Sequence, residues 1–180
     1  MNDRSVVLLD ESMLEQYVDY LHAHMSESGI NGNLIYTPFP LNYEHPKEMM
    51  LKNIGDNIKK PFEATRWERT FICMDGVDIV AHAALKGHYL DAALHRCEVG
   101  LGMNQAVRAQ GLGKRMMEHS IEWLKTNSPI EYIDLYVFSH NQAAIKLYTK
   151  LGFNHVGVNE DMFRVNGLPI DDNRMTLKLR

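Results

Sequence analysis

Residues 103–114 read Met-Asn-Gln-Ala-Val-Arg-Ala-Gln-Gly-Leu-Gly-Lys, which places an Arg-x-x-Gly-x-Gly step between a strand-like run and an amphipathic helical run. Backbone N–H groups at the start of a helix have no intrahelical partner, and together with the helix dipole they attract anions. Gly111 and Gly113 have no Cβ, which would let the chain come close to phosphate groups. The stretch predicts a strand, a pyrophosphate-binding turn and a helix. Glycines that only shape the turn are the alternative.

Two other phosphate-binding motifs do not fit this stretch. A Walker loop needs Gly, four residues and then Gly-Lys-Ser/Thr, whereas here the first position is Arg108 and Lys114 is followed by Arg115. A dinucleotide fingerprint needs a third glycine where Met116 stands. The spacing therefore excludes both motifs.

A second informative segment, residues 137–153, reads Val-Phe-Ser-His-Asn-Gln-Ala-Ala-Ile-Lys-Leu-Tyr-Thr-Lys-Leu-Gly-Phe. Asn141 is typical of a helix N-cap, and Gly152 is typical of the left-handed residue that ends a helix. The pattern predicts a strand followed by a short helix. An ordinary core tyrosine at position 148 and a simple cap at position 141 remain open alternatives. Four residues share one face of this helix: Ala144, Ile145, Tyr148 and Leu151.

The two segments, in this order and separated by one helix and one strand, resemble the hallmarks of the GNAT N-acetyltransferase superfamily. The resemblance is densest over residues 98–153. A hairpin at Asn166-Gly167, followed by Asp171-Asp172 and Met175, is similar to the end of the amino-acid and ribosomal-protein acetylating branches. The resemblance implies an α/β (α+β) fold with a mixed sheet of six to seven strands, about four helices and a splay between strands 4 and 5.

The resemblance also implies a site for acetyl-CoA as cosubstrate. Tyr148 would be the general acid, and the main-chain N–H of Met103 would stabilise the oxyanion. Asn141 and Glu98 complete the predicted catalytic set. No metal is expected. The predicted acetyl-CoA contacts are Leu101, Met103, Arg108, Ala109, Gln110, Gly111, Leu112, Gly113, Lys114, Asn141, Ala144 and Tyr148.

The residue types at positions 148 and 98 suit acyl transfer to an amine. An alkylamine with a pKa of about 10 is protonated at neutral pH and must lose a proton before it attacks. A leaving thiolate with a pKa of about 8.5 gains from a proton donor, and a phenol can be that donor. Strand alternation puts Glu98 and Cys97 on opposite faces. If Glu98 faces the cleft it can act as base; pairing with Arg96, or deprotonation through a water chain, are the alternatives.

Composition and charge narrow the class of protein. The chain has 180 residues, the usual size of one domain, so residues 1–180 are predicted to form a single domain. A net charge of -4 argues against nucleic-acid binding through bulk charge. The apolar start Val6–Leu9 is too short for a signal or membrane segment, so a cytoplasmic protein without membrane contact is expected. Cys73 and Cys97 indicate neither a disulfide framework nor a zinc site. A homodimer is left open.

Local patterns predict the remaining elements. Ser12-x-x-Glu15 resembles a capping box, and Asp75-Gly76 predicts a hairpin like that at Asn166-Gly167. Gly100 and Gly102 suggest a bulge in their strand. The predicted elements are a strand at 5–9, a helix from 12, a loop at 29–46, a helix from about 47, strands at 70–74, 77–85 and 97–103, a helix from 112, a strand at 130–137, a helix after 141 and two final strands. This order matches the GNAT fold.

Three activities fit these features. The first is an acetyl-CoA-dependent N-acetyltransferase that acts through a ternary complex. The second is an acyl-CoA-binding regulatory module without catalysis, which could dispense with Tyr148. The third is a ping-pong acyltransferase with Cys97 as nucleophile, but His95 would lie about 7 Å away along the strand.

The acceptor is predicted only as a primary amine: an amino acid or analogue, a polyamine, an aminoglycoside or a protein N-terminus. Specificity would reside in the loop at 29–46 and the terminal hairpin at 163–172. Aromatic residues near acidic groups would suit a cationic amine. The acidic residues Glu44, Asp161, Asp171 and Asp172 are expected to be plain surface charge.

Overall fold

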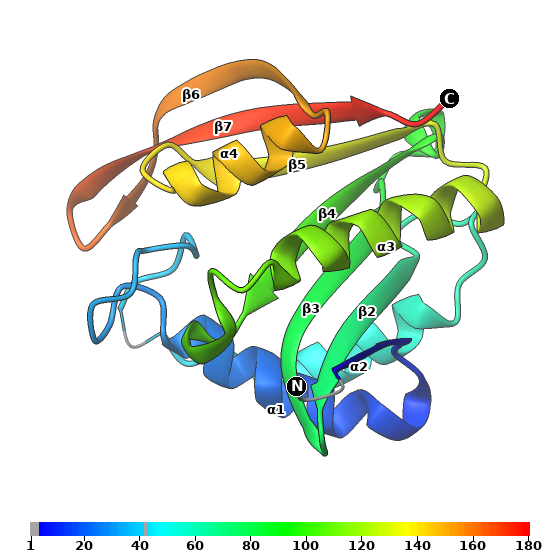
Figure 1. The fold of residues 1–180 in the computed structure, drawn as a ribbon, viewed down its shortest axis with the longest axis horizontal. Helices are drawn as coiled ribbons and strands as arrows, with labels where there is room; N and C mark the ends of the chain where they lie inside the picture. The colour runs from blue at the N-terminus through cyan, green and yellow to red at the C-terminus, as the bar shows by residue number, and fades with distance from the viewer. Residues whose placement is uncertain (1–3, 42) are drawn as a thin grey trace.

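A computed structural model describes residues 4–41 and 43–180. These residues form a mixed sheet of seven strands in the order β1-β2-β3-β4-β5-β7-β6, with four α-helices (Figure 1). Neighbouring strands are antiparallel except β4 and β5, which are parallel. The predicted fold class and element order are confirmed. The elements are β1 (Ser5–Leu8), α1 (Leu14–Ser26), α2 (Lys47–Ile58), β2 (Glu68–Asp75), β3 (Asp78–Gly87), β4 (Arg96–Met103), α3 (Leu112–Asn127), β5 (Tyr132–Phe138), α4 (Gln142–Lys150), β6 (Asn154–Val165) and β7 (Leu168–Lys178).

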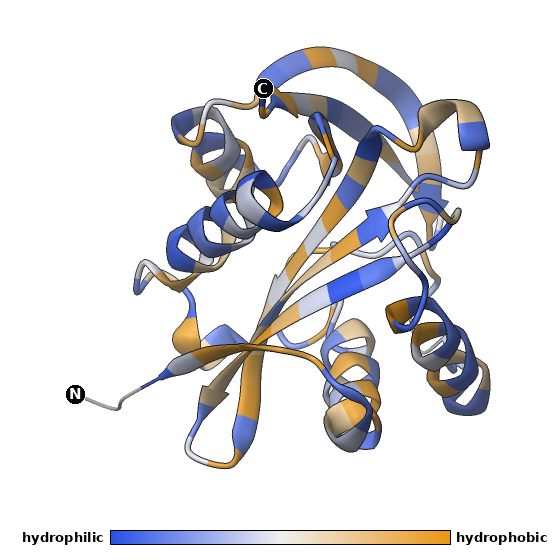
Figure 2. Ribbon diagram, turned by 90° about the vertical axis from the view of Figure 1, so that its right-hand side faces the viewer, coloured by the Kyte–Doolittle hydropathy of each residue, from blue (hydrophilic) through white to orange (hydrophobic). Residues whose placement is uncertain are grey.

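The sheet carries helices on both faces. Side chains alternate along β2, so Phe71 packs in the cluster that includes α3 and α4, while Ile72 packs in the cluster that includes α1 and α2. Apolar segments run through the central strands, whereas each helix carries hydrophobic and hydrophilic residues in alternation (Figure 2). No helix among the described residues is long and apolar enough to cross a membrane.

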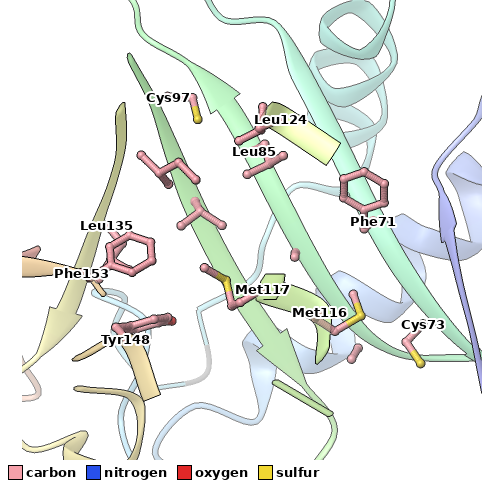
Figure 3. Close-up of a cluster of buried hydrophobic side chains, with 14 of the residues drawn as sticks. Phe71, Cys73, Leu85, Cys97, Met116, Met117, Leu124, Leu135, Tyr148 and Phe153 are labelled. Atoms are coloured by element: carbon pink, nitrogen blue, oxygen red, sulfur yellow. The ribbon is translucent and has the colours of Figure 1, made fainter. Parts of the chain in front are cut away.

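The larger core cluster fixes α3 against the sheet. Met116, Met117 and Leu124 of α3 are fully buried and lie among residues of β2, β3 and β4 (Figure 3). Complete burial of each such side chain stabilises the fold by roughly 1.5–3 kcal/mol. The start of α3 is therefore held firmly beside the end of β4.

The two halves of the sheet diverge between β4 and β5. The strands pair only at Arg96↔Tyr132, Cys97↔Ile133 and Glu98↔Asp134, after which they separate (Figure 1). The paired end is fixed by Arg96, whose Nε and Nη2 donate to the two carboxylate oxygens of Asp134 at 2.7 and 2.6 Å. Such a bidentate pair is strong and directional. The predicted splay is confirmed.

Two local predictions are wrong. Asp10, rather than Ser12, caps the first helical turn, because its Oδ1 accepts from the Ser12 backbone N–H at 2.8 Å. No bulge occurs in the pairing of β4 with β3, whose register runs unbroken from Ala81↔Met103 to Gly87↔Cys97. Gly102 instead lets the imidazole rings of His24 and His82 lie close to the β4 backbone, since a Cβ there would collide with both rings.

Candidate active site

A cavity of about 990 Å³ lies in the splay of the sheet. It is lined by the start of α3, the outer half of β4, α4, the loop after α1, and parts of β5, β6 and β7. The structure brings together Glu98 and all the predicted acetyl-CoA contacts except Gln110. The Gln110 side chain instead accepts from Arg4 Nη1 at 2.8 Å and donates to the Ala106 carbonyl at 3.0 Å.

The start of α3 presents unpartnered backbone N–H groups. Its N-cap, Gly111, has a φ of 77° and offers no side-chain cap. The Arg115 N–H donates to the Gly111 carbonyl at 3.1 Å. This is the first N–H group of α3 that donates to a carbonyl four residues earlier. The N–H groups of residues 112–114 precede it and point out of the helix end. This end suits an anionic group.

The two glycines of the motif have different structural roles. A Cβ on Gly111 would meet no heavy atom within 4 Å, so this residue borders open space. A Cβ on Gly113 would lie 2.9 Å from Met103 Cε and 3.3 Å from Leu147 Cδ2. Gly113 lines the cavity, as predicted for the turn, and it also allows α3 to pack closely against side chains of β4 and α4.

Along the outer half of β4, backbone N–H groups point into the gap where β5 has separated from β4. The Asn104 N–H donates to the Val80 carbonyl at 2.9 Å, and this bond shows which residues of β4 direct their N–H groups toward β3. In an antiparallel ladder the next residues alternate between facing the partner and facing away. The N–H groups of Met103, Leu101 and Val99 therefore point away from β3, toward the side on which β5 has diverged.

Arg108 binds the end of β4 and the loop after α1. Its Nε and Nη2 donate to the Met103 carbonyl at 3.3 and 3.2 Å, and Nη1 donates to Asn33 Oδ1 at 2.9 Å. Its guanidinium carbon lies 5.6 Å from the centroid of the Tyr36 ring. The Arg108 side chain, predicted to contact acetyl-CoA, lines the cavity but is already engaged by these neutral partners.

Helix α4 positions Tyr148. Asn141 caps this helix, because its Oδ1 accepts from the Ala144 N–H at 3.2 Å, and Gly152 ends it with a φ of 91°. Tyr148 is only 6% exposed, packs 5.7 Å from the Phe153 ring centroid and lines the cavity. Burial raises the pKa of Tyr148 to about 12, so the phenol keeps its proton at neutral pH. Tyr148 is thus both a core residue and a cavity residue.

Glu98 and Cys97 lie on opposite faces of β4, as their alternation predicts. Glu98 lines the cavity, and desolvation raises the pKa of its carboxyl above the usual value; Asp134 adds to the rise and Lys86 opposes it. Arg96, its proposed alternative partner, pairs with Asp134 instead.

Cys97 belongs to the hydrophobic core. It is 2% exposed and packs within the cluster drawn in Figure 3. Burial raises the pKa of its thiol far above the usual value. The nearby His95 ring packs against Tyr132, with centroids 6.1 Å apart. A protonated, buried thiol is a poor nucleophile, which argues against the ping-pong hypothesis.

Three ionisable residues of the cavity were not among the predicted site residues, although Asp172 lies in the hairpin that was predicted to set specificity. Asp172, expected to be surface charge, is 3% exposed and lines the cavity. His24 and His82 also line it, with ring centroids 5.7 Å apart, and burial lowers the pKa of His24 to about 4. The place of Asp172 after the Asn166-Gly167 hairpin and its alternation with Ile170 were sequence signals for this residue; neither histidine had one. Within residues 4–41 and 43–180, no group of three or more His, Cys, Asp or Glu residues could hold a metal ion.

Comparison with known proteins identifies the family. The model of the acetyltransferase (GNAT) family matches residues 34–153, which include the β4–α3 turn and the whole of α4. The chain belongs to the acetyltransferase (GNAT) family. Among curated relatives, this GNAT chain is 28% identical over 99 residues to the L-amino acid N-acetyltransferase AaaT of Escherichia coli. That match covers 55% of this chain and 60% of the relative, so it spans less than two thirds of the relative's length.

Solved structures share the same GNAT fold. An acetyltransferase of the GNAT family from Streptococcus pneumoniae is similar with a TM-score of 0.81 and 18% identity, over 98% of this chain and 99% of that one. A protein from Salmonella typhimurium, solved with its cofactor acetyl-CoA, gives a TM-score of 0.79 and 14% identity, over 99% of this chain and 95% of that one. At these identities the likeness concerns the fold.

Proposed function

We propose that this GNAT chain transfers an acetyl group from acetyl-CoA to a primary amine by direct attack in a ternary complex, within one domain that spans residues 1–180. The observation that carries the proposal is a single cavity lined by the start of α3, the splayed edge of β4 and Tyr148. The cavity thus combines the helix start of α3, which suits an anion, the backbone N–H donors of β4 and the proton donor Tyr148. Acyl transfer from a pyrophosphate-bearing thioester needs these three features together.

The cavity fits acetyl-CoA in size and in donor groups. The uncapped N–H groups of residues 112–114 would hold the pyrophosphate, and Gly111 leaves the approach open. The outward N–H groups of β4 would receive the other end of the molecule along the splay. A relative of the same fold solved with acetyl-CoA supports this assignment.

Three groups of the chain would each serve one step of the acetyl transfer. Glu98 would take a proton from the acceptor ammonium, which frees the nitrogen lone pair for attack; a raised carboxyl pKa, closer to neutral pH, helps this step. The Met103 N–H would stabilise the oxyanion that forms on the thioester carbonyl. Tyr148 would give its proton to the departing thiolate. CoA would then leave as the neutral thiol, and the negative charge would pass to the Tyr148 oxygen until it regains a proton from solvent. The burial that raises the phenol pKa would also raise the pKa of a thiol in the same cavity, which keeps the two values closer together.

The acceptor is proposed as a small amine or a peptide N-terminus. The curated relative is an L-amino acid N-acetyltransferase, which supports an amino acid or analogue; polyamines, aminoglycosides and protein N-termini share the reacting group. Binding would use the loop after α1 together with β6 and β7, whose residues also line the cavity.

A panel of amines tests the proposed activity. We expect release of free CoA thiol from acetyl-CoA to depend on at least one of these four amine classes, with saturation in both substrates. The control is the same enzyme without amine, because slow hydrolysis also releases thiol. Thiol release that no primary amine accelerates, in a protein that binds acetyl-CoA, would support a binding module without catalysis instead.

A further inference from the structure

Two carboxylates face the cavity from opposite sides of the splay. Glu98 lies on β4, and Asp172 lies on β7, where it pairs with Phe138 at the end of β5. Both residues line the same cavity, and burial together with the charge of Glu98 raises the pKa of Asp172. The acceptor end of the cavity therefore carries two acidic groups.

Asp172 has no partner within the described part of the chain. It is 3% exposed, and its Oδ1 is fully buried without a hydrogen bond. Its neighbours on β7 are engaged: Asp171 Oδ1 accepts from the Asp161 N–H at 2.8 Å, and Asn173 Nδ2 donates to Ser139 Oγ at 2.7 Å. Arg174, the nearest cation along the strand, lies 3.7 Å from Asp134. A buried carboxylate without a donor is costly, so a ligand that supplies a cation would relieve the cost.

The surroundings of Asp172 strengthen any ion pair formed there. The β6–β7 register shifts between Asn159 and Phe163, and this irregularity brings Met162 and Phe163 to the cavity wall. Phe138 stands beside them, 5.6 Å from the Phe163 ring centroid. Apolar walls lower the local dielectric, which makes a charge pair worth more than it is in water.

The two carboxylates have different environments. Glu98 is exposed and has Lys86 nearby, so it can exchange a proton with solvent. Asp172 has neither feature. A carboxylate that cannot pass a proton to solvent would hold a bound ammonium in its charged form. Asp172 is therefore suited to a cationic group that does not react.

We propose that Asp172 binds a second, non-reacting cationic group of the acceptor, so that the preferred substrate is a diamine, a polyamine or another amine with a second positive charge. This inference rests on the proposed acetyl transfer and selects among its acceptor classes. Asp172 thus sets specificity, while Glu98 accepts the proton of the reacting nitrogen.

A matched pair of acceptors tests the proposal. Cadaverine and pentylamine have the same chain, and only cadaverine carries a second ammonium. With the wild-type protein, kcat/KM should be about 10- to 100-fold higher for cadaverine, which is the usual effect of one buried charged hydrogen bond. Asp172→Asn should bring the ratio of the two kcat/KM values close to one, because the loss falls mainly on cadaverine. The control Glu160→Gln removes an exposed carboxylate on β6 and should retain the preference.

Each contrary outcome has a distinct meaning. Equal use of both amines by the wild-type protein, or an activity confined to acceptors without a second cation, would overturn the role of Asp172 while acetyl transfer stands. An equal loss on both amines in Asp172→Asn would assign the residue a structural role. If the wild-type protein binds acetyl-CoA but acetylates no amine, the proposed function itself fails, and the inference fails with it.

Discussion

Replacement of Tyr148 by Phe should lower kcat about 100- to 10,000-fold, the usual effect of losing a positioned acid. The ring and its packing against Phe153 survive, so the affinity for acetyl-CoA should stay close to wild type. Only the proton donor to the leaving thiolate is lost. Steady-state kinetics with a verified amine acceptor, together with a binding measurement for acetyl-CoA, give the two values.

Two controls make this result specific. Tyr132→Phe removes the same atom from a tyrosine outside the cavity and should keep wild-type kcat. Acyl donors with a more acidic leaving thiol need less proton donation, so they should narrow the gap between Tyr148→Phe and the wild type. A Tyr148→Phe protein that is as fast as wild type, with chemistry rate-limiting, would leave Tyr148 as a core residue only.

The second large effect concerns binding. Gly111→Trp should abolish the rise in melting temperature that acetyl-CoA gives the wild-type protein. A ligand that binds only the folded state at about 100 times its Kd stabilises it by about 2.7 kcal/mol. At Gly111 a bulky side chain would occupy the open space in front of the uncapped N–H groups of α3.

The measured quantity is the shift caused by the ligand, because a non-glycine residue at a φ of 77° is itself strained. Gly76→Trp is the matched control: this glycine has a φ of 64°, also borders open space, and lies in the β2–β3 turn. It should lose stability but keep the full shift with acetyl-CoA. An undiminished shift in Gly111→Trp would remove the proposed pyrophosphate site.

Local sequence patterns predicted the elements that form the cavity. The Arg-x-x-Gly-x-Gly step predicted the β4–α3 turn, and the segment from Asn141 to Gly152 predicted the cap, the buried face and the end of α4. These features depend on residues close together in the chain. Backbone conformation and helical periodicity are local, so the sequence carries them directly.

Features that depend on tertiary contacts were not predictable in the same way. Asp172 looks like surface charge in the sequence, yet it is 3% exposed on β7, a strand that lies between β5 and β6. Gly102 suggested a bulge, yet its absent Cβ makes room for two histidines from α1 and β3. Gly113 likewise accommodates side chains from β4 and α4.

The most direct test of the central claim, direct acetyl transfer within the splay cavity, is a single-turnover experiment with enzyme in excess over acetyl-CoA. After addition of the best amine from the panel, acetylated amine and free CoA are followed together, and the protein mass is recorded at each time. The account predicts that both products appear at one rate and that the protein never gains an acetyl group. A protein acetylated first, on Cys97 or elsewhere, that then passes the group to the amine would contradict it.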